Sequence, residues 1–163
     1  MSHGTKKSKV LFERALGVMV EGGSSPSRGP ANYGDYPLFI ERGSGSRIWD
    51  VDGNEYIDWM LAYGALPLGH AHPSVVEAIT GAASGGSLLA AATEIEIEVA
   101  ELIAGMVPGA ERVRFANTGT EATMAAIRLA RGMMGRPKFI KFEGHYHGWY
   151  DDFLVNSHPQ SAV

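Results

Sequence analysis

The residues best placed to do chemistry lie where a short apolar run meets a helix, at Thr118, Gly119 and Thr120. Residues 113–116 predict a strand, and the small residues from Gly119 onward predict a helix that begins directly after it. A corner of this kind directs backbone N–H groups and two hydroxyls at one point, on the positive end of a helix dipole. We therefore expect this corner to bind a phosphate group.

Tyr146 and His147 follow later in the chain, and the ring of Tyr146 is suited to cover a flat ring held by such a phosphate. The corner has a second interpretation, in which Thr118 only caps the helix and Gly119 relieves the turn. Other phosphate and nucleophile motifs are missing from the sequence. It contains no Gly-x-x-x-x-Gly-Lys, no three-glycine dinucleotide fingerprint and no Gly-x-Ser-x-Gly elbow, which disfavours nucleotide and esterase chemistry.

Two further sets of residues have open interpretations. Ser25 and Arg28 lie in a loop rich in glycine, serine and proline, where they are either a solvated surface pair or a clamp for a carboxylate. Tyr63 is either a core side chain or a pocket wall, and base rates favour the core. The histidine pairs 70/72 and 145/147 lie at chain reversals without acidic partners at a helical ligand spacing, so we expect no metal site.

Composition excludes several classes of function. The 163 residues are 45% hydrophobic and 20% charged, which is typical of one ordinary globular domain. The net charge of -4 argues against nucleic acid or an anionic membrane as a partner. The absence of cysteine excludes disulfides and thiolate chemistry. Without a secretory signal or an apolar run of membrane-spanning length, we expect a cytoplasmic protein.

The elements that must position these residues fall into two regions. We expect a helix over residues 9–20, a hairpin of strands 47–50 and 56–59 around Asp52-Gly53, and a helix from Pro73. A glycine-rich break over residues 81–87 predicts a boundary, with one region over 1–86 and another over 87–163. In the second region we expect a helix capped by Thr93 and Glu96 and the helix 119–131 between two parallel strands, 113–116 and 139–142. Because an open parallel sheet does not end with a buried edge, we expect the chain to be the N-terminal piece of a larger protein.

Four sequence blocks, in this order and spacing, resemble the class III, fold-type-I aminotransferases that use pyridoxal 5'-phosphate, and within them the glutamate-1-semialdehyde aminomutases and their relatives. The blocks cover residues 49–58, 68–73, 117–132 and 141–148. The resemblance implies an α/β fold of the fold-type-I class. It implies that residues 1–86 belong to the small domain and its link, and that residues 87–163 begin the large, mostly parallel-sheet domain that binds the cofactor.

The resemblance also implies a role for each candidate residue. Thr118, Gly119 and Thr120 would hold the cofactor phosphate, Tyr146 would stack on the pyridine ring, and His147 would lie beside it. The substrate would be bound by Ser25, Arg28 and Tyr63, and its carboxylate by the first two. Members of the family are homodimers with the active site at the subunit interface, so this chain alone is expected to expose apolar surface.

Two departures from the family pattern shape the functional expectation. The Schiff-base lysine and the aspartate that pairs with the pyridinium nitrogen are expected beyond residue 163, and neither Lys138 nor Lys141 matches that lysine, so the chain alone is expected to be inactive. Tyr63 stands where the aminomutases have tryptophan, which favours a transaminase acting on an amino acid, with a β- or D-amino acid as one option. A genuine glutamate-1-semialdehyde aminomutase and a truncated, non-catalytic module are the alternatives.

Overall fold

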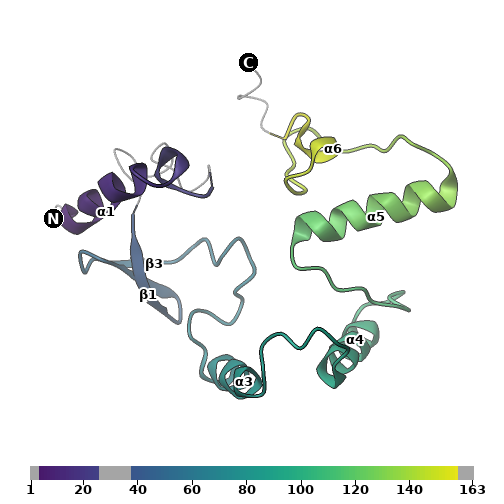
Figure 1. Ribbon diagram of the computed structural model, residues 1–163, viewed down its shortest axis with the longest axis horizontal. Helices are drawn as coiled ribbons and strands as arrows, with labels where there is room; N and C mark the ends of the chain where they lie inside the picture. The colour runs from purple at the N-terminus through teal and green to yellow at the C-terminus, as the bar shows by residue number, and fades with distance from the viewer. Residues whose placement is uncertain (1–3, 26–37, 158–163) are drawn as a thin grey trace. The chain divides into compact units, whose positions relative to one another are not determined.

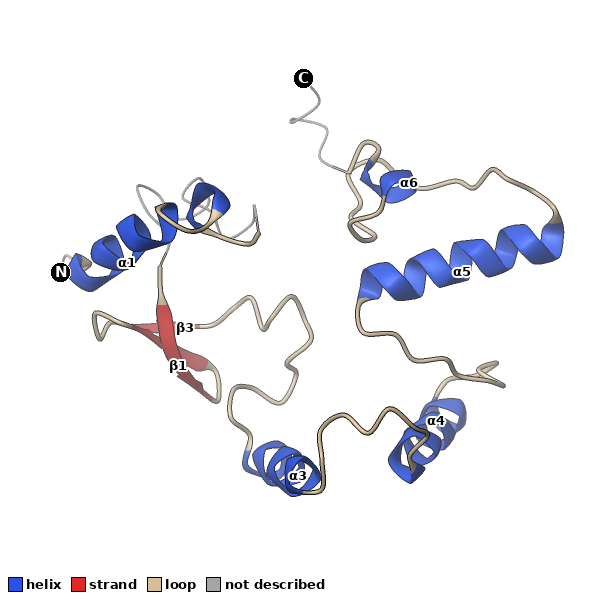
Figure 2. Ribbon diagram, viewed as in Figure 1, coloured by secondary structure: helices blue, strands red, loops and turns tan. Residues whose placement is uncertain are grey.

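The computed structural model describes residues 4–25 and 38–157 and divides the chain into two compact units, Met1–Leu89 and Ala90–Val163. Figure 1 follows the chain through both units, and in Figure 2 the strands among the described residues all lie in the first unit. Arg28, which is predicted to bind the substrate, lies outside the described residues.

The first unit is built on a small antiparallel sheet with the order β1-β2-β3. Its strands are β1 (Ile40–Ser44), β2 (Arg47–Asp50) and β3 (Glu55–Ile57). The predicted hairpin at Asp52-Gly53 is confirmed as the β2–β3 turn, where Gly53 takes the φ of +87° that glycine tolerates best. The preceding strand β1 was not predicted; its run of Arg42, Gly43 and Ser44 lacks the apolar alternation of a strand.

Asp50 at the end of β2 organises the hairpin turn. Its carboxylate is fully buried and accepts hydrogen bonds from the Asp52 and Asn54 amides, the Asn54 side chain at 2.8 Å and the Tyr56 hydroxyl at 2.9 Å. Burial raises the pKa of Asp50, but the hydrogen bonds from Asn54, Tyr56 and Asp52 together outweigh it and hold the pKa below its ordinary value. The charged carboxylate therefore stabilises the turn by accepting four hydrogen bonds.

Helices complete the first unit. The helix α1 (Lys6–Leu16) begins three residues before the predicted start, because the Asp52 carboxylate accepts from the amides of Lys7 and Ser8 at 2.7 and 2.9 Å. A 3-10 turn, η1 (Val20–Gly22), follows it. The helix α3 (Pro73–Ser84) confirms the predicted start at Pro73. The break predicted over residues 81–87 is wrong for residues 81–84, which continue the helix to its C-cap at Gly85.

The second unit contains α4 (Glu94–Met106), α5 (Gly119–Met134) and the short α6 (Asp151–Leu154). After α5 the chain reverses and returns to the start of that helix (Figure 1). Gly135 ends α5 with a φ of +62°. The sequence predicts this helix end, because glycine commonly takes such a left-handed conformation directly after a helix. The predicted capping box at Thr93 and Glu96 is wrong, since the Thr93 side chain makes no capping hydrogen bond.

The two predicted parallel strands, 113–116 and 139–142, are also wrong as strands, because neither is paired in the part of the chain that the structure describes. Both runs lack a ladder partner, and apolar residues alone do not supply one. Ile140 is 96% exposed and Phe142 is 73% exposed. Of the described apolar side chains, only Ala15 and Phe153 are buried. The expectation that the chain alone exposes apolar surface is therefore confirmed for the described part of the chain.

Candidate functional site

The start of α5 carries a complete capping box. Thr118 Oγ1 accepts from the Glu121 amide at 3.1 Å, and Glu121 Oε2 accepts from the Thr118 amide at 2.8 Å and from the Thr118 hydroxyl at 3.2 Å. A cap of this kind stabilises a helix by about 0.5–2 kcal/mol. In this arrangement both donors of Thr118 are used by Glu121, so the capping interpretation of Thr118 is the one that the geometry realises.

The next two residues supply the donors that remain. No protein acceptor within the described residues bonds to the amides of Gly119 and Thr120, which occupy the first turn of a 16-residue helix. A Cβ placed on Gly119 would meet nothing within 4 Å, so the space above its backbone is open. Two free amides on the positive end of a helix dipole, beside the Thr120 hydroxyl, are a donor set that suits a phosphate or another anion.

The segment that carries Tyr146 and His147 is held against this same helix turn. The hydroxyl of Thr123 lies 2.8 Å from the His147 carbonyl oxygen, and the Trp149 amide donates to Thr120 Oγ1 at 3.0 Å. Between them Gly148 is buried with a φ of +120°, and a Cβ there would lie 2.8 Å from Thr120 Cα. Only glycine permits this approach. The structure thus brings the predicted residues 118–120 and 146–147 together.

Aromatic and charged side chains hold the returning segment in place. The ring of buried Phe153 packs edge-on against Phe139, His147 and Tyr150, with centroid distances of 5.6, 6.3 and 5.8 Å. Arg131 at the end of α5 bonds to Asp152 Oδ2 at 2.7 Å. The ammonium of Lys141 donates to the Phe153 carbonyl at 2.6 Å, a structural role that agrees with giving this lysine no part in catalysis.

The ring of Tyr146 is 59% exposed, and His147 is half-buried. The stacking of Tyr146 on a cofactor ring and the position of His147 beside it stay predictions.

The predicted substrate residues lie in the first unit. Ser25 is half-buried after η1, and Tyr63 is 66% exposed in a turn that follows β3. The core and pocket-wall interpretations of Tyr63 both stay open. Ser25 and Tyr63 both belong to the first unit, whereas α5 belongs to the second. That these residues bind a substrate together with α5 stays a prediction.

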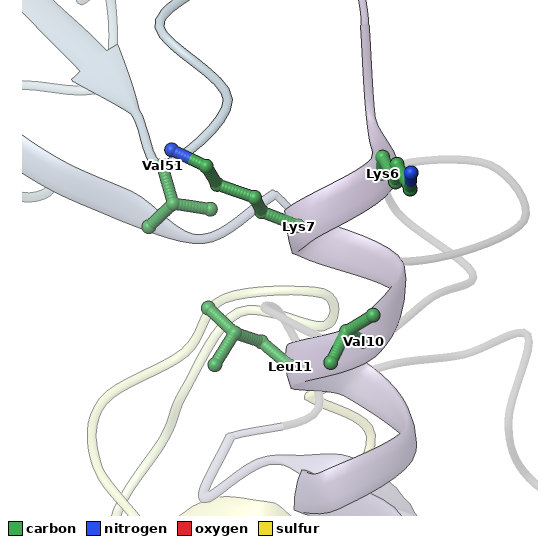
Figure 3. A pocket seen from close by; sticks show the side chains of 5 residues that line it. All are labelled: Lys6, Lys7, Val10, Leu11 and Val51. Atoms are coloured by element: carbon green, nitrogen blue, oxygen red, sulfur yellow. The ribbon is translucent and has the colours of Figure 1, made fainter.

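A hollow of about 380 Å³ next to α1 is a second place to consider (Figure 3). Lys7 extends from α1 toward Val51 across it, and Lys6, Val10 and Leu11 complete the lining. Its polar groups are two lysines only, and it contains none of the candidate residues.

Among the described residues, no group of three or more histidines and carboxylates is placed to hold a metal ion. None of the described helices is long and apolar enough to cross a bilayer.

Sequence reasoning missed the residues that join the two halves of this site, Thr123 and Trp149. Thr123 is a helix-interior threonine whose hydroxyl also lies 2.9 and 3.1 Å from the Gly119 and Thr120 carbonyl oxygens, a common local contact that gives no sign of the longer-range one. Gly148 was the available signal, because an isolated glycine beside aromatic residues indicates a close approach of backbone.

Comparison with known proteins shows which family the chain is similar to. Residues 29–163 match the aminotransferase class-III family. The chain is 53% identical over 152 residues to the glutamate-1-semialdehyde 2,1-aminomutase of Persephonella marina, covering 93% of the chain but 36% of that protein. Among solved structures, an omega-transaminase from Sphaerobacter thermophilus is 42% identical with a TM-score of 0.88, over 93% of this chain and 34% of the other. A beta-phenylalanine aminotransferase from Variovorax paradoxus is 35% identical with a TM-score of 0.83, over 88% and 33%.

The chain therefore spans about a third of the length of the proteins that it matches. The matched region contains the α5 corner and the returning segment, and the family uses pyridoxal phosphate. The donor set at α5 fits that cofactor, because its phosphate ester is an anion and its pyridine ring is flat. With its fold-type-I structural relatives and its match over most of its length, the chain belongs to the class-III aminotransferase family.

Proposed function

We propose that the complete gene product containing this chain is a pyridoxal-phosphate-dependent transaminase that acts on an amino acid. The observation that carries this proposal is the pair of unbonded amides at Gly119 and Thr120, with the Tyr146 segment bound to the same helix turn. The bound cofactor would supply an electron sink for the substrate carbanion.

The part of the chain described here positions groups rather than moving protons. The amides of Gly119 and Thr120 and the Thr120 hydroxyl would hold the phosphate, and the Thr123 and Thr120 contacts would hold the segment that carries Tyr146 next to that group. Ser25 and Arg28 would bind the substrate carboxylate, and Tyr63 would line the substrate pocket. We also propose that the complete protein is a cytoplasmic homodimer; the exposed apolar side chains of α4 support further packing.

A genuine glutamate-1-semialdehyde 2,1-aminomutase is the second candidate, favoured by the 53% identity with a protein of that name. The residue at position 63 separates the two candidates, since the resemblance places tryptophan there in aminomutases. The identities of 42% and 35% with an omega-transaminase and a beta-phenylalanine aminotransferase favour transamination, with a β-amino acid as one substrate class.

The test is an assay of the complete gene product with α- and β-amino acid donors and with pyruvate or 2-oxoglutarate as acceptor. We expect amine transfer to the keto acid and little isomerisation of glutamate-1-semialdehyde. Isomerisation without amine transfer would establish the second candidate. A protein that binds pyridoxal phosphate but catalyses neither reaction would be the non-catalytic module.

A further inference from the structure

The turn after β3, residues 60–64, holds Tyr63 in an unusual backbone conformation. Leu61, Ala62 and Tyr63 have φ values of +46°, +51° and +59°, and Gly64 continues at +86°. The Tyr63 amide donates to the Met60 carbonyl at 2.8 Å, and the Gly64 amide donates to the Leu61 carbonyl at 3.0 Å. A left-handed conformation costs an L-residue roughly 1–2 kcal/mol, so three in succession require support from their surroundings.

Asp58, the residue directly after β3, provides that support at the start of the turn. Its Oδ1 accepts from the Met60 amide at 2.8 Å and from the Leu61 amide at 3.2 Å. Its own amide donates to the Ser46 carbonyl at 2.9 Å, which anchors it to the sheet. Its side chain is only 8% exposed. One fixed carboxylate oxygen therefore receives the two amides that open the left-handed turn.

His70 fixes the other oxygen of that carboxylate. Its Nε2 lies 2.7 Å from Asp58 Oδ2, and its backbone exchanges hydrogen bonds with Gly45 at 2.9 and 2.8 Å. The His70 ring lies directly over Gly43, where a Cβ would be 2.5 Å from the ring. The hydrogen bond from His70 is the main cause that lowers the pKa of Asp58, so the carboxylate stays ionised as the strong acceptor that the turn needs.

We propose that Asp58 and His70 form a positioning pair that locks the left-handed turn and thereby sets where Tyr63 meets the substrate. The inference rests on the proposed function, in which Tyr63 lines the substrate pocket. Neither Asp58 nor His70 needs to touch the substrate. Their effect on substrate binding passes through the backbone of residues 60–64.

The experiment compares Asp58→Ala and His70→Ala with the matched control Asp52→Ala in the complete gene product loaded with pyridoxal phosphate. Asp52 also accepts two backbone amides, but from α1 and not from the turn. We expect the KM for the amino substrate to rise about 10-fold or more in the first two variants, with kcat and cofactor affinity changed far less. Asp52→Ala should leave KM unchanged. An unchanged KM in both Asp58→Ala and His70→Ala would overturn the proposal.

A double-variant cycle tests whether the effect passes through Tyr63. In a Tyr63→Ala background, Asp58→Ala should add little to KM, because the side chain that it positions is gone. A full additional rise in KM would show that Asp58 acts by another route and would overturn the proposal. If Asp58→Ala does not fold, His70→Ala carries the same cycle, since it keeps the acceptor of the two amides and removes only the group that fixes the Asp58 carboxylate.

Amide hydrogen exchange over residues 60–66 separates this proposal from the proposed function. Loss of exchange protection in Asp58→Ala and His70→Ala, but not in Asp52→Ala, is expected whether or not the protein transfers amines. Retained protection would overturn the locking role even in an active transaminase. A protein with the expected exchange and no amine transfer would refute the proposed function and leave the pair as the lock of the turn.

Discussion

The hydroxyl of Thr123 lies 2.8 Å from the carbonyl oxygen of His147, which binds the returning chain to the first turn of α5. Without this contact and the Trp149–Thr120 hydrogen bond, Tyr146 and the free amides of α5 would be independent features of the sequence. With both contacts, the segment that carries Tyr146 is held against the helix turn that carries these amides.

Replacing Thr123 with valine keeps its shape and removes the hydroxyl. We expect a loss of about 1–3 kcal/mol in the free energy of unfolding, because the His147 carbonyl is left without its donor. Chemical denaturation of the complete gene product measures this loss. Thr123→Ser is the control and should retain most of the stability; equal losses for valine and serine would show that the hydroxyl is unimportant.

Thr120 and Thr118 are predicted to contribute unequally to cofactor binding. Thr120→Val removes a hydroxyl from the free donor set, and we expect the apoenzyme to bind pyridoxal phosphate about 10- to 100-fold more weakly, the usual effect of losing a hydrogen bond to a charged group. Thr118→Val should mainly lower stability, since its hydroxyl is bonded to Glu121. Cofactor titrations followed by absorbance measure the affinity of both variants for pyridoxal phosphate. A larger loss of affinity for Thr118→Val would contradict the geometry.

Gly148 and Gly144 both have positive φ values, +120° and +77°, but only Gly148 lies against the backbone of Thr120. Gly144→Ala should cost about 1–2 kcal/mol of stability from backbone strain alone. Gly148→Ala should cost more, and it should also weaken cofactor binding because the Tyr146 segment is pushed away from α5. Denaturation and cofactor titration of the two variants check this order. Equal effects on cofactor affinity would contradict the proposed close approach.

The hairpin turn around Asp50 should lose stability in acid. Because the pKa of Asp50 is lowered in the folded state, the unfolded state binds more protons as the pH falls. The stabilisation is therefore complete above the ordinary carboxyl pKa, near 3.8, and disappears as the pH falls through the lower folded pKa. Amide exchange of residues 47–57 between pH 6 and pH 3 measures the effect. Asp50→Asn should flatten this dependence, and an unchanged acid slope in that variant would contradict the role of Asp50.

Local signals in the sequence predicted some elements well. Asp52-Gly53 specified the β2–β3 turn, Pro73 specified the start of α3, and Gly135 specified the end of α5, because each residue type imposes its own backbone conformation. The same reasoning predicted that residues 118–120 and 146–147 belong to one cofactor site, which stays a prediction. Of its two interpretations of Thr118, the structure shows the helix cap, with Glu121 as the partner.

Features that depend on distant partners were not predictable in the same way. Residues 113–116 and 139–142 have the composition of strands, but a strand also needs a ladder partner, which composition does not identify. The Asp58–His70 pair and the left-handed turn at Tyr63 leave no local pattern either, since three non-glycine residues in that conformation contradict local preference.

The most direct test of the cofactor site is a crystal structure of the complete gene product with pyridoxal phosphate bound. We expect phosphate oxygens within hydrogen-bond distance of the Gly119 and Thr120 amide nitrogens, and the Tyr146 ring against the face of the pyridine. A phosphate bound elsewhere, with those two amides facing water or a protein acceptor, would contradict the account.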